Sequence, residues 1–282
     1  MIKTIGVLGA GIMGAGITQV AAQTGLNVIM RDITDDFVSR GLSGIKNNLD
    51  REVQKNRLSQ EDARAIVSRI KGTANIADMS EADFVIEAVM EKMELKREVY
   101  GELDKICLPT AIFASNTSGL SITEMASATS RPNRIIGMHF FNPVPVMKLV
   151  EIIKGTETDE ETVRQTQELA EKMGKEYIMV TEAPLFVVNR ILVPMINDAI
   201  FTLMEGVASA EDIDKAMRLG ANHPIGPLAL ADLVGLDTVL LVQDTLYKET
   251  GDSKYRPCAL LRKMVRAGHL GRKTGRGFYN YK

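Results

Sequence analysis

Apolar positions follow two different periods in residues 1–183. Short apolar runs of strand length alternate with longer stretches in which apolar residues recur at helical spacing. The predicted strands are Ile5–Leu8, Leu26–Met30, Asp83–Val89, Ala111–Ser115, Ile135–Phe141, Leu149–Ile153 and Glu176–Val180, and helices are predicted between them over Leu95–Ile106, Ile122–Ala128 and Asp159–Met173. Strands that alternate with helices are typical of an α/β fold with a doubly wound, mainly parallel sheet.

A polar segment interrupts this pattern at about residues 34–71. It reads as a helical hairpin without a strand, and basic side chains outnumber acidic ones from Lys46 to Lys71. One interpretation is a solvated surface hairpin. The other is a flap that carries positive charge toward an anionic substrate.

The pattern changes near Pro184. Residues 184–282 contain no predicted strand, and the first helix, Phe186–Met204, is long and apolar. Further helices are predicted at Ser209–Leu219, Leu228–Val234, Leu236–Tyr247 and Pro257–Ala267. We therefore expect two domains, 1–183 and 184–282, of which the second is all-helical, contributes to substrate binding and forms a homodimer. The side chains predicted at the dimer interface are Met195, Ile196, Ile200 and Leu203.

Composition narrows the class of protein. The 282 residues are 45% hydrophobic and 25% charged, with a net charge of −2, which favours neither nucleic acid nor an anionic membrane as a partner. Cys107 and Cys258 fit no metal-ligand spacing, so we expect reduced thiols and no metal site. The chain has no recognisable signal peptide or membrane-spanning run, and we expect a cytoplasmic protein.

The stretch Thr4–Asp32 combines a strand, a glycine-rich turn, a helix and a second strand that ends in an acid. Such an arrangement is typical of a Rossmann-type dinucleotide site: Gly9 permits the turn, Gly11 lets backbone approach a diphosphate, and Gly14 allows close packing. Ile12 and Met13 lie between them, at the helix N-terminus that would face the diphosphate. The alternative, a merely structural turn, leaves the terminal acid unexplained.

Asp32 bears on the choice of cofactor. It is placed to accept hydrogen bonds from the adenosine ribose, and its charge would repel a 2′-phosphate by about 1 kcal/mol or more. NAD(H) is therefore favoured. Arg31 beside it keeps NADP(H) open as an alternative, although neighbouring side chains of a strand point to opposite faces.

A candidate acid–base pair lies at equal distances on either side of Pro145. His139 ends one apolar run and Glu151 lies in the next. If the chain reverses near Pro145, the two side chains become cross-strand partners, and a carboxylate on one imidazole nitrogen makes the other a better base. The alternative is a hydrogen-bonded core histidine.

Several motifs together resemble the 3-hydroxyacyl-CoA dehydrogenases, most closely the single-function 3-hydroxybutyryl-CoA dehydrogenases of bacteria. The resemblance covers essentially the whole chain. The matching motifs are GAGIMGAGI at the start, EAVME (Glu87–Glu91), SNTS (Ser115–Ser118), HFFNPVP (His139–Pro145), Asn189-Arg190 and GRKTGRGFY (Gly271–Tyr279).

The resemblance implies an NAD-dependent enzyme that interconverts short-chain (S)-3-hydroxyacyl-CoA and 3-oxoacyl-CoA by hydride transfer. His139 would be the general base, Glu151 would orient it, and Ser118 and Asn189 would hold the substrate oxygens. Glu91, Lys96, Asn116, Asn142 and Lys273 would join the glycine turn and Asp32 around the cofactor. Asn48 and Lys55 on the basic hairpin would contact coenzyme A, together with Ser118.

Simpler roles stay open for some of these residues, because Ser118 also reads as a turn residue and Asn189 as a structural residue in an apolar helix. Gly119 follows Ser118 where many relatives have a second serine. Two other functions also stay open. One is a β-hydroxyacid dehydrogenase that uses free acids, and the other is a non-catalytic relative of the dehydrogenases.

Overall fold

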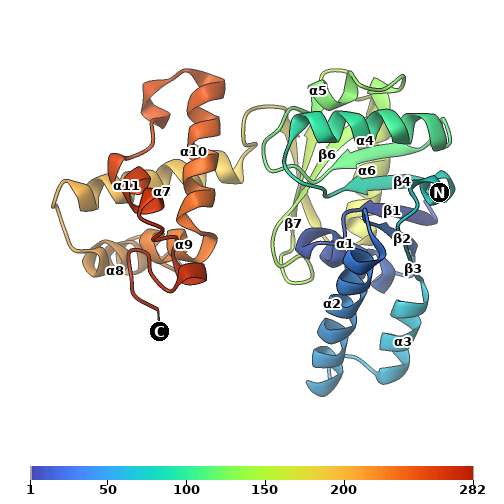
Figure 1. Ribbon diagram of the computed structural model, residues 1–282, viewed down its shortest axis with the longest axis horizontal. Helices are drawn as coiled ribbons and strands as arrows, with labels where there is room; N and C mark the ends of the chain where they lie inside the picture. Colours follow the sequence, from blue (N-terminus) through green and yellow to red (C-terminus); the bar gives the residue numbers. More distant parts are fainter. Residues whose placement is uncertain (1, 282) are drawn as a thin grey trace. The chain divides into compact units, whose positions relative to one another are not determined.

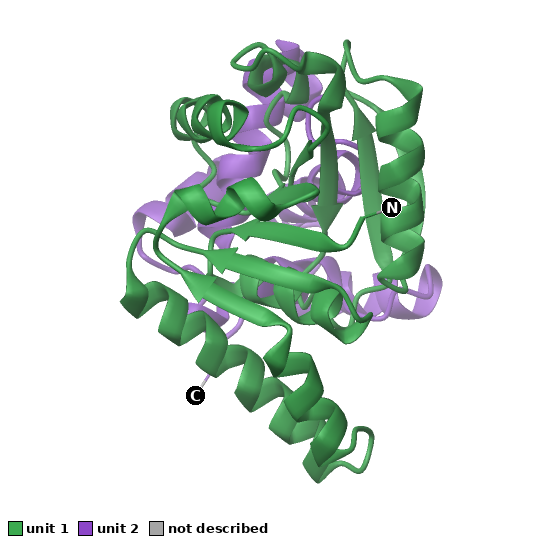
Figure 2. Ribbon diagram, turned by 90° about the vertical axis from the view of Figure 1, so that its right-hand side faces the viewer, with its two compact units in different colours: residues 1–183 green, residues 184–282 purple. Residues whose placement is uncertain are grey.

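The computed structural model describes residues 2–281, and the chain divides into two compact units. These are Met1–Ala183 and Pro184–Lys282 (Figure 2). Within the described residues, no helix combines the length and the apolar character needed to cross a bilayer.

The first unit is organised around an eight-stranded sheet with the strand order β3-β2-β1-β4-β5-β6-β7-β8 (Figure 1). Every neighbouring pair is parallel except β6 and β7, which are antiparallel. The strands are β1 (Thr4–Leu8), β2 (Asn27–Arg31), β3 (Ile70–Thr73), β4 (Phe84–Glu87), β5 (Ile112–Ser115), β6 (Ile135–Phe140), β7 (Leu149–Lys154) and β8 (Glu176–Thr181). The predicted doubly wound, mainly parallel sheet is confirmed.

Helices cover both faces of this sheet. Apolar side chains of α1, α2, α3 and α6 pack on one face in a continuous core. On the other face, Tyr100 of α4 lies edge-on to Phe113 of β5 with ring centroids 6.1 Å apart, and α5 contacts β6. The helices are α1 (Ile12–Gln23), α2 (Asp35–Gln54), α3 (Gln60–Ser68), α4 (Met93–Ile106), α5 (Ile122–Ala126) and α6 (Glu160–Lys172), with the 3₁₀ turns η1 (Ile76–Glu81) and η2 (Pro132–Arg134).

Hydrogen bonds from helix-capping side chains fix several of these helix starts. Thr34, Ser59, Ser121 and Asp159 each accept a hydrogen bond from a backbone N–H in the first turn of the following helix. These caps satisfy N–H groups that have no partner inside the helix. The helical hairpin predicted for residues 34–71 is present as α2 and α3, which lie side by side (Figure 1).

The prediction that this segment contains no strand was wrong, because strand β3 occupies Ile70–Thr73. This edge strand pairs only with β2 and carries a single large apolar side chain, Ile70. Its backbone hydrogen bonds and the contact of Gly72 with α2 hold it, and neither leaves an apolar pattern in the sequence.

The second unit is helical, as predicted. Its helices are α7 (Val188–Met204), α8 (Ala210–Gly220), α9 (Pro227–Val234), α10 (Leu236–Thr250) and α11 (Ala259–Arg266), with the 3₁₀ turns η3 (Ser253–Tyr255) and η4 (Arg272–Thr274). Ile196 and Ile200 are 1% and 0% exposed in the core of this unit, so their assignment to a dimer interface was wrong. Met195, by contrast, lines a hollow on the surface of the unit.

Candidate active site

Several of the predicted functional residues of the first unit lie at one edge of the sheet. Strands β1, β2, β4, β5 and β6 are mutually parallel, so their carboxyl ends lie at the same edge. Gly9, Asp32 and Asn116 each directly follow one of these strands, and His139 is the last residue but one of β6. Ligands of open α/β sheets bind at this edge.

The glycine turn after β1 has the geometry of a dinucleotide cradle. Gly9 has φ of +99°, and a Cβ on Gly14 would lie 1.8 Å from the Gly9 carbonyl oxygen, so both positions require glycine. A Cβ on Gly11 would meet nothing within 4 Å, which leaves its backbone open to an approaching ligand. Ile12, 78% exposed, begins α1, and no side chain caps that helix. This open helix N-terminus fits a diphosphate.

Asp32 lies against the same turn. Its carboxylate accepts hydrogen bonds from Ala10 N at 2.7 Å and from Ile33 N at 2.7 Å. The side chain of Arg31 points elsewhere, with Nε 3.4 Å from the Ala74 carbonyl oxygen. Asp32 therefore supplies the negative charge next to the turn, and the predicted choice of NAD(H) depends on that charge.

His139 and Glu151 are direct partners in the antiparallel pair β6–β7. His139 Nδ1 lies 2.7 Å from Glu151 Oε2, and the two side chains are 6% and 0% exposed. Phe141 packs on the imidazole with ring centroids 4.5 Å apart. The chain reversal near Pro145 that the sequence predicted is thus confirmed, and a carboxylate lies on one nitrogen of the ring.

The loop after β5 carries Asn116 and Ser118 and is fixed from two sides. Asn116 Oδ1 accepts a hydrogen bond from Phe140 N at 2.9 Å, which ties the loop to the strand of His139. Glu91 accepts hydrogen bonds from Thr117 Oγ1 at 2.5 Å and from Ser118 N at 2.8 Å. Glu91 therefore holds the loop of the predicted substrate-binding serine, while its predicted contact with the cofactor stays a prediction.

A buried ionic network lies beneath this loop. Lys96 Nζ is 2.6 Å from Glu87 and 3.2 Å from Glu91, and its side chain is 1% exposed. Glu87 also accepts hydrogen bonds from Ser115 Oγ and from Val89 N, both at 2.7 Å. The family resemblance implied a cofactor contact for Lys96 and gave no role to Glu87. An acid at the end of an otherwise apolar strand was the available signal, because a buried carboxylate needs a partner.

Asn142 lies in the loop that joins β6 to β7, three residues after His139, and it is exposed. Met13, on the glycine turn, packs against the core of the sheet. The structure thus places Asn142 at the same sheet edge as the turn, and its role stays a prediction.

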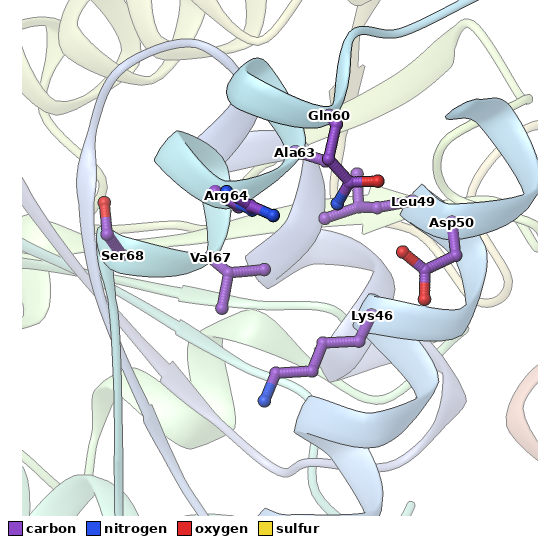
Figure 3. Close-up of a pocket in the computed structure, with 8 residues that line it drawn as sticks. All are labelled: Lys46, Leu49, Asp50, Gln60, Ala63, Arg64, Val67 and Ser68. Atoms are coloured by element: carbon purple, nitrogen blue, oxygen red, sulfur yellow. The ribbon is translucent and has the colours of Figure 1, made fainter. Parts of the chain in front are cut away.

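The basic hairpin contains a pocket of about 340 Å³, drawn in Figure 3. Asn48 and Lys55 do not line it; Lys46 and Asp50 do, and they lie about half a turn around α2 from Asn48. Asn48 Nδ2 instead donates to Gln19 of α1 at 3.4 Å, and Lys55 lies 3.6 Å from Glu52. The other lining residues are Leu49, Gln60, Ala63, Arg64, Val67 and Ser68.

Two predicted residues belong to the second unit. Asn189 is the second residue of α7, in the first turn and not in the helix interior. Lys273 Nζ lies 2.6 Å from Asp237 Oδ2 within the same unit. Their predicted contacts with ligands of the first unit stay predictions.

Comparisons with known proteins place the chain in a family. The sequence model of the 3-hydroxyacyl-CoA dehydrogenase NAD-binding domain matches residues 4–183, and that of the C-terminal domain matches residues 186–281. A probable 3-hydroxybutyryl-CoA dehydrogenase of Bacillus subtilis is 52% identical over 99% of this chain and 98% of its own. The 3-hydroxybutyryl-CoA dehydrogenase of Bradyrhizobium diazoefficiens is 50% identical over 100% of this chain and 96% of its own.

A solved structure leads to the same family. The crystal structure of (S)-3-hydroxybutyryl-CoA dehydrogenase from Ralstonia eutropha matches with a TM-score of 0.98 and 52% identity, covering 100% of both chains. These matches and the NAD-binding domain at residues 4–183 agree with the geometry of the glycine turn. The chain belongs to the 3-hydroxyacyl-CoA dehydrogenase family.

Proposed function

We propose that this protein is an NAD-dependent (S)-3-hydroxyacyl-CoA dehydrogenase that interconverts 3-hydroxybutyryl-CoA and acetoacetyl-CoA. The substrate comes from the names of the similar proteins, and the (S) configuration from the Ralstonia enzyme. The observation that carries the mechanism is the His139–Glu151 pair, because it lies at the same sheet edge as the dinucleotide turn.

The pair handles the proton of the reaction. Glu151 on Nδ1 favours the tautomer that carries hydrogen on that nitrogen, which leaves Nε2 with a lone pair. In the oxidation, His139 takes the proton of the 3-hydroxyl group as the C3–O bond becomes a carbonyl, and in the reduction it returns that proton. When bound, NAD(H) accepts or supplies the hydride at C3.

Glu151 has a second role in this mechanism. The imidazolium that forms on His139 is nearly enclosed, and its charge requires a neighbouring anion. The carboxylate is 0% exposed and 2.7 Å away, so it compensates the charge when it forms. Without it, the proton would be held less tightly and the base would be weaker.

Ser118 and Asn189 hold the substrate's 3-oxygen and thioester carbonyl in this proposal. The support for Ser118 is that Glu91 fixes its backbone N–H, which sets the direction of the loop. Rigid placement of the substrate against the base accounts for a large share of catalysis in such a reaction.

The basic hairpin binds coenzyme A. Asn48 lies in α2, and Lys55, seven residues later, is the residue that ends this helix, so the two lie on the same side of the hairpin. A lysine on that face can meet a coenzyme A phosphate as a point charge.

The second unit supports a homodimer. Exposed Ile191 and Val207, 66% and 70% accessible, line a hollow of about 640 Å³ together with Met195. An exposed apolar patch of this kind is typical of a protein–protein contact.

A cytoplasmic location stays a prediction.

One assay separates this function from the two alternatives. The purified protein is mixed with NADH and acetoacetyl-CoA, and the loss of NADH absorbance is followed. A matched reaction contains free acetoacetate. Turnover of the thioester alone supports the proposal, turnover of the free acid favours a β-hydroxyacid dehydrogenase, and turnover of neither favours a non-catalytic relative.

A further inference from the structure

Lys175 is a buried lysine that the mechanism above does not use. It is 7% exposed and follows α6. Its Nζ donates hydrogen bonds to two carbonyl oxygens, that of Val144 at 2.5 Å and that of Met147 at 2.8 Å. Within residues 2–281 the structure pairs it with no carboxylate. Burial lowers the pKa of its ammonium.

An arrangement of this kind costs free energy, because a buried ammonium is normally paired with an anion. An apolar side chain of similar length, such as methionine, would fill the same space without that cost. The two carbonyl oxygens, however, belong to one segment, residues 141–148, which joins the strands of His139 and Glu151. Among the described residues, the ammonium of Lys175 thus donates only to the backbone of this segment, which we call the reversal loop.

The backbone of Lys175 is itself fixed. Its N–H donates to the Ala170 carbonyl of α6 at 3.0 Å, and Gly174, with φ of +68°, ends that helix. The ammonium therefore extends from a rigid helix end. Any movement of the reversal loop away from α6 breaks both of its hydrogen bonds.

The reversal loop also packs on α1. A Cβ on Gly16 would lie 2.9 Å from Val144 Cβ, so the loop is packed against the helix that follows the dinucleotide turn. Within the loop, Val146 N and Met147 N both donate to the Pro143 carbonyl, at 2.9 and 3.0 Å. The loop is a compact turn that contacts both α1 and Lys175.

We propose that Lys175 is a positioning residue that fixes the reversal loop and thereby the relative placement of His139 and Asn142. The catalytic half of this proposal rests on the proposed function, because it requires His139 to act as the base. The anchoring half does not, because it concerns only where the loop lies. A displacement of about 1 Å at a reacting group can cost about 100-fold in rate.

The test uses Lys175→Met and, as a matched control, Lys172→Met. Lys172 is an exposed lysine at the end of the same helix. The chain has no tryptophan, so Val146→Trp, at a position 71% exposed in the reversal loop, adds a single fluorescent reporter to each background. Thermal unfolding followed by circular dichroism identifies folded variants. If Lys175→Met does not fold, Lys175→Leu, which likewise has no hydrogen-bond donor, replaces it in every measurement.

The expected result has two parts. Reporter anisotropy falls in Lys175→Met relative to the control, because the loop gains freedom. The kcat for acetoacetyl-CoA reduction falls about 10- to 100-fold, and the KM for NADH rises, at temperatures well below unfolding. A merely structural lysine would lower the unfolding temperature without changing kcat or KM.

Each contrary result has a defined meaning. Unchanged anisotropy overturns the anchoring role. Lower anisotropy with unchanged kcat and KM overturns the positioning role. If the unvaried protein does not turn over acetoacetyl-CoA, the proposed function fails, while the anisotropy and the Kd for NADH still decide whether Lys175 fixes the loop beside the cofactor.

Discussion

His139 and Glu151 face each other across the antiparallel pair β6–β7, with Nδ1 2.7 Å from Oε2. Their strands are adjacent only because the chain reverses between them, within the loop that Lys175 holds. Because β6 is parallel to β1 and β5, this pair lies at the carboxyl edge of the sheet, where the glycine turn also lies. The relationship explains how a base and a dinucleotide turn far apart in sequence can serve one reaction.

Replacing the base tests its role directly. His139→Gln keeps a polar side chain but cannot take a proton at neutral pH, so kcat for acetoacetyl-CoA reduction should fall about 100- to 10,000-fold. The Kd for NADH, measured by its fluorescence, should stay within twofold of the unvaried protein. Near-normal turnover would reject His139 as the base.

The charge of Asp32 should set the choice between NADH and NADPH. Asp32→Asn keeps an oxygen that can accept the hydrogen bond from Ala10 N but removes the negative charge. We expect the ratio of kcat/KM for NADH over NADPH to fall at least about 5-fold, since charge repulsion of about 1 kcal/mol or more is lost. A ratio that does not change would place the preference elsewhere.

The buried network should be far more sensitive than a surface pair. Glu87→Gln leaves the buried Lys96 ammonium without its nearer carboxylate, and the free energy of unfolding should fall by about 3–5 kcal/mol. Glu81→Gln is the control, because Glu81 pairs with Lys71 on the surface and should leave stability unchanged within error. Both are measured by urea unfolding. Equal effects in the two variants would contradict the assigned role of burial.

The hollow of the second unit should control association. Ile191→Asp places a charge in the apolar hollow and should convert a dimer to a monomer in size-exclusion chromatography with light scattering. Leu241→Asp is the control, because Leu241 is 64% exposed in the same unit and does not line the hollow. Dissociation by both variants, or by neither, would argue against this surface.

The sequence predicted the parts of this fold that apolar periodicity encodes. The strands on either side of Pro145 and their cross-strand contact followed from the spacing of His139 and Glu151. Strand β3 could not be predicted in this way, because an edge strand with one large apolar side chain shows no alternation of apolar and polar residues. Ile196 and Ile200 were assigned to an interface because periodicity shows that a face is apolar but not what covers it.

Networks of buried side chains could not be predicted from the sequence either. The family resemblance implied a cofactor contact for Lys96, but it did not reveal that the ammonium is paired with Glu87 and Glu91. Lys175 gave no signal, because its partners are backbone carbonyls, which every residue has. A side-chain contact with backbone atoms can be identified only once the position of the loop that contains those atoms is known.

The pH dependence of Glu151→Gln is the most direct test of the central claim that a carboxylate-braced imidazole moves the proton. In the oxidation of 3-hydroxybutyryl-CoA, kcat/KM is measured from acid to neutral pH for the unvaried protein and the variant. Glutamine cannot compensate an imidazolium, so His139 should lose its proton more readily. The account predicts a lower plateau and an acid limb shifted to lower pH. A lower plateau with an acid limb at the same pH would contradict it.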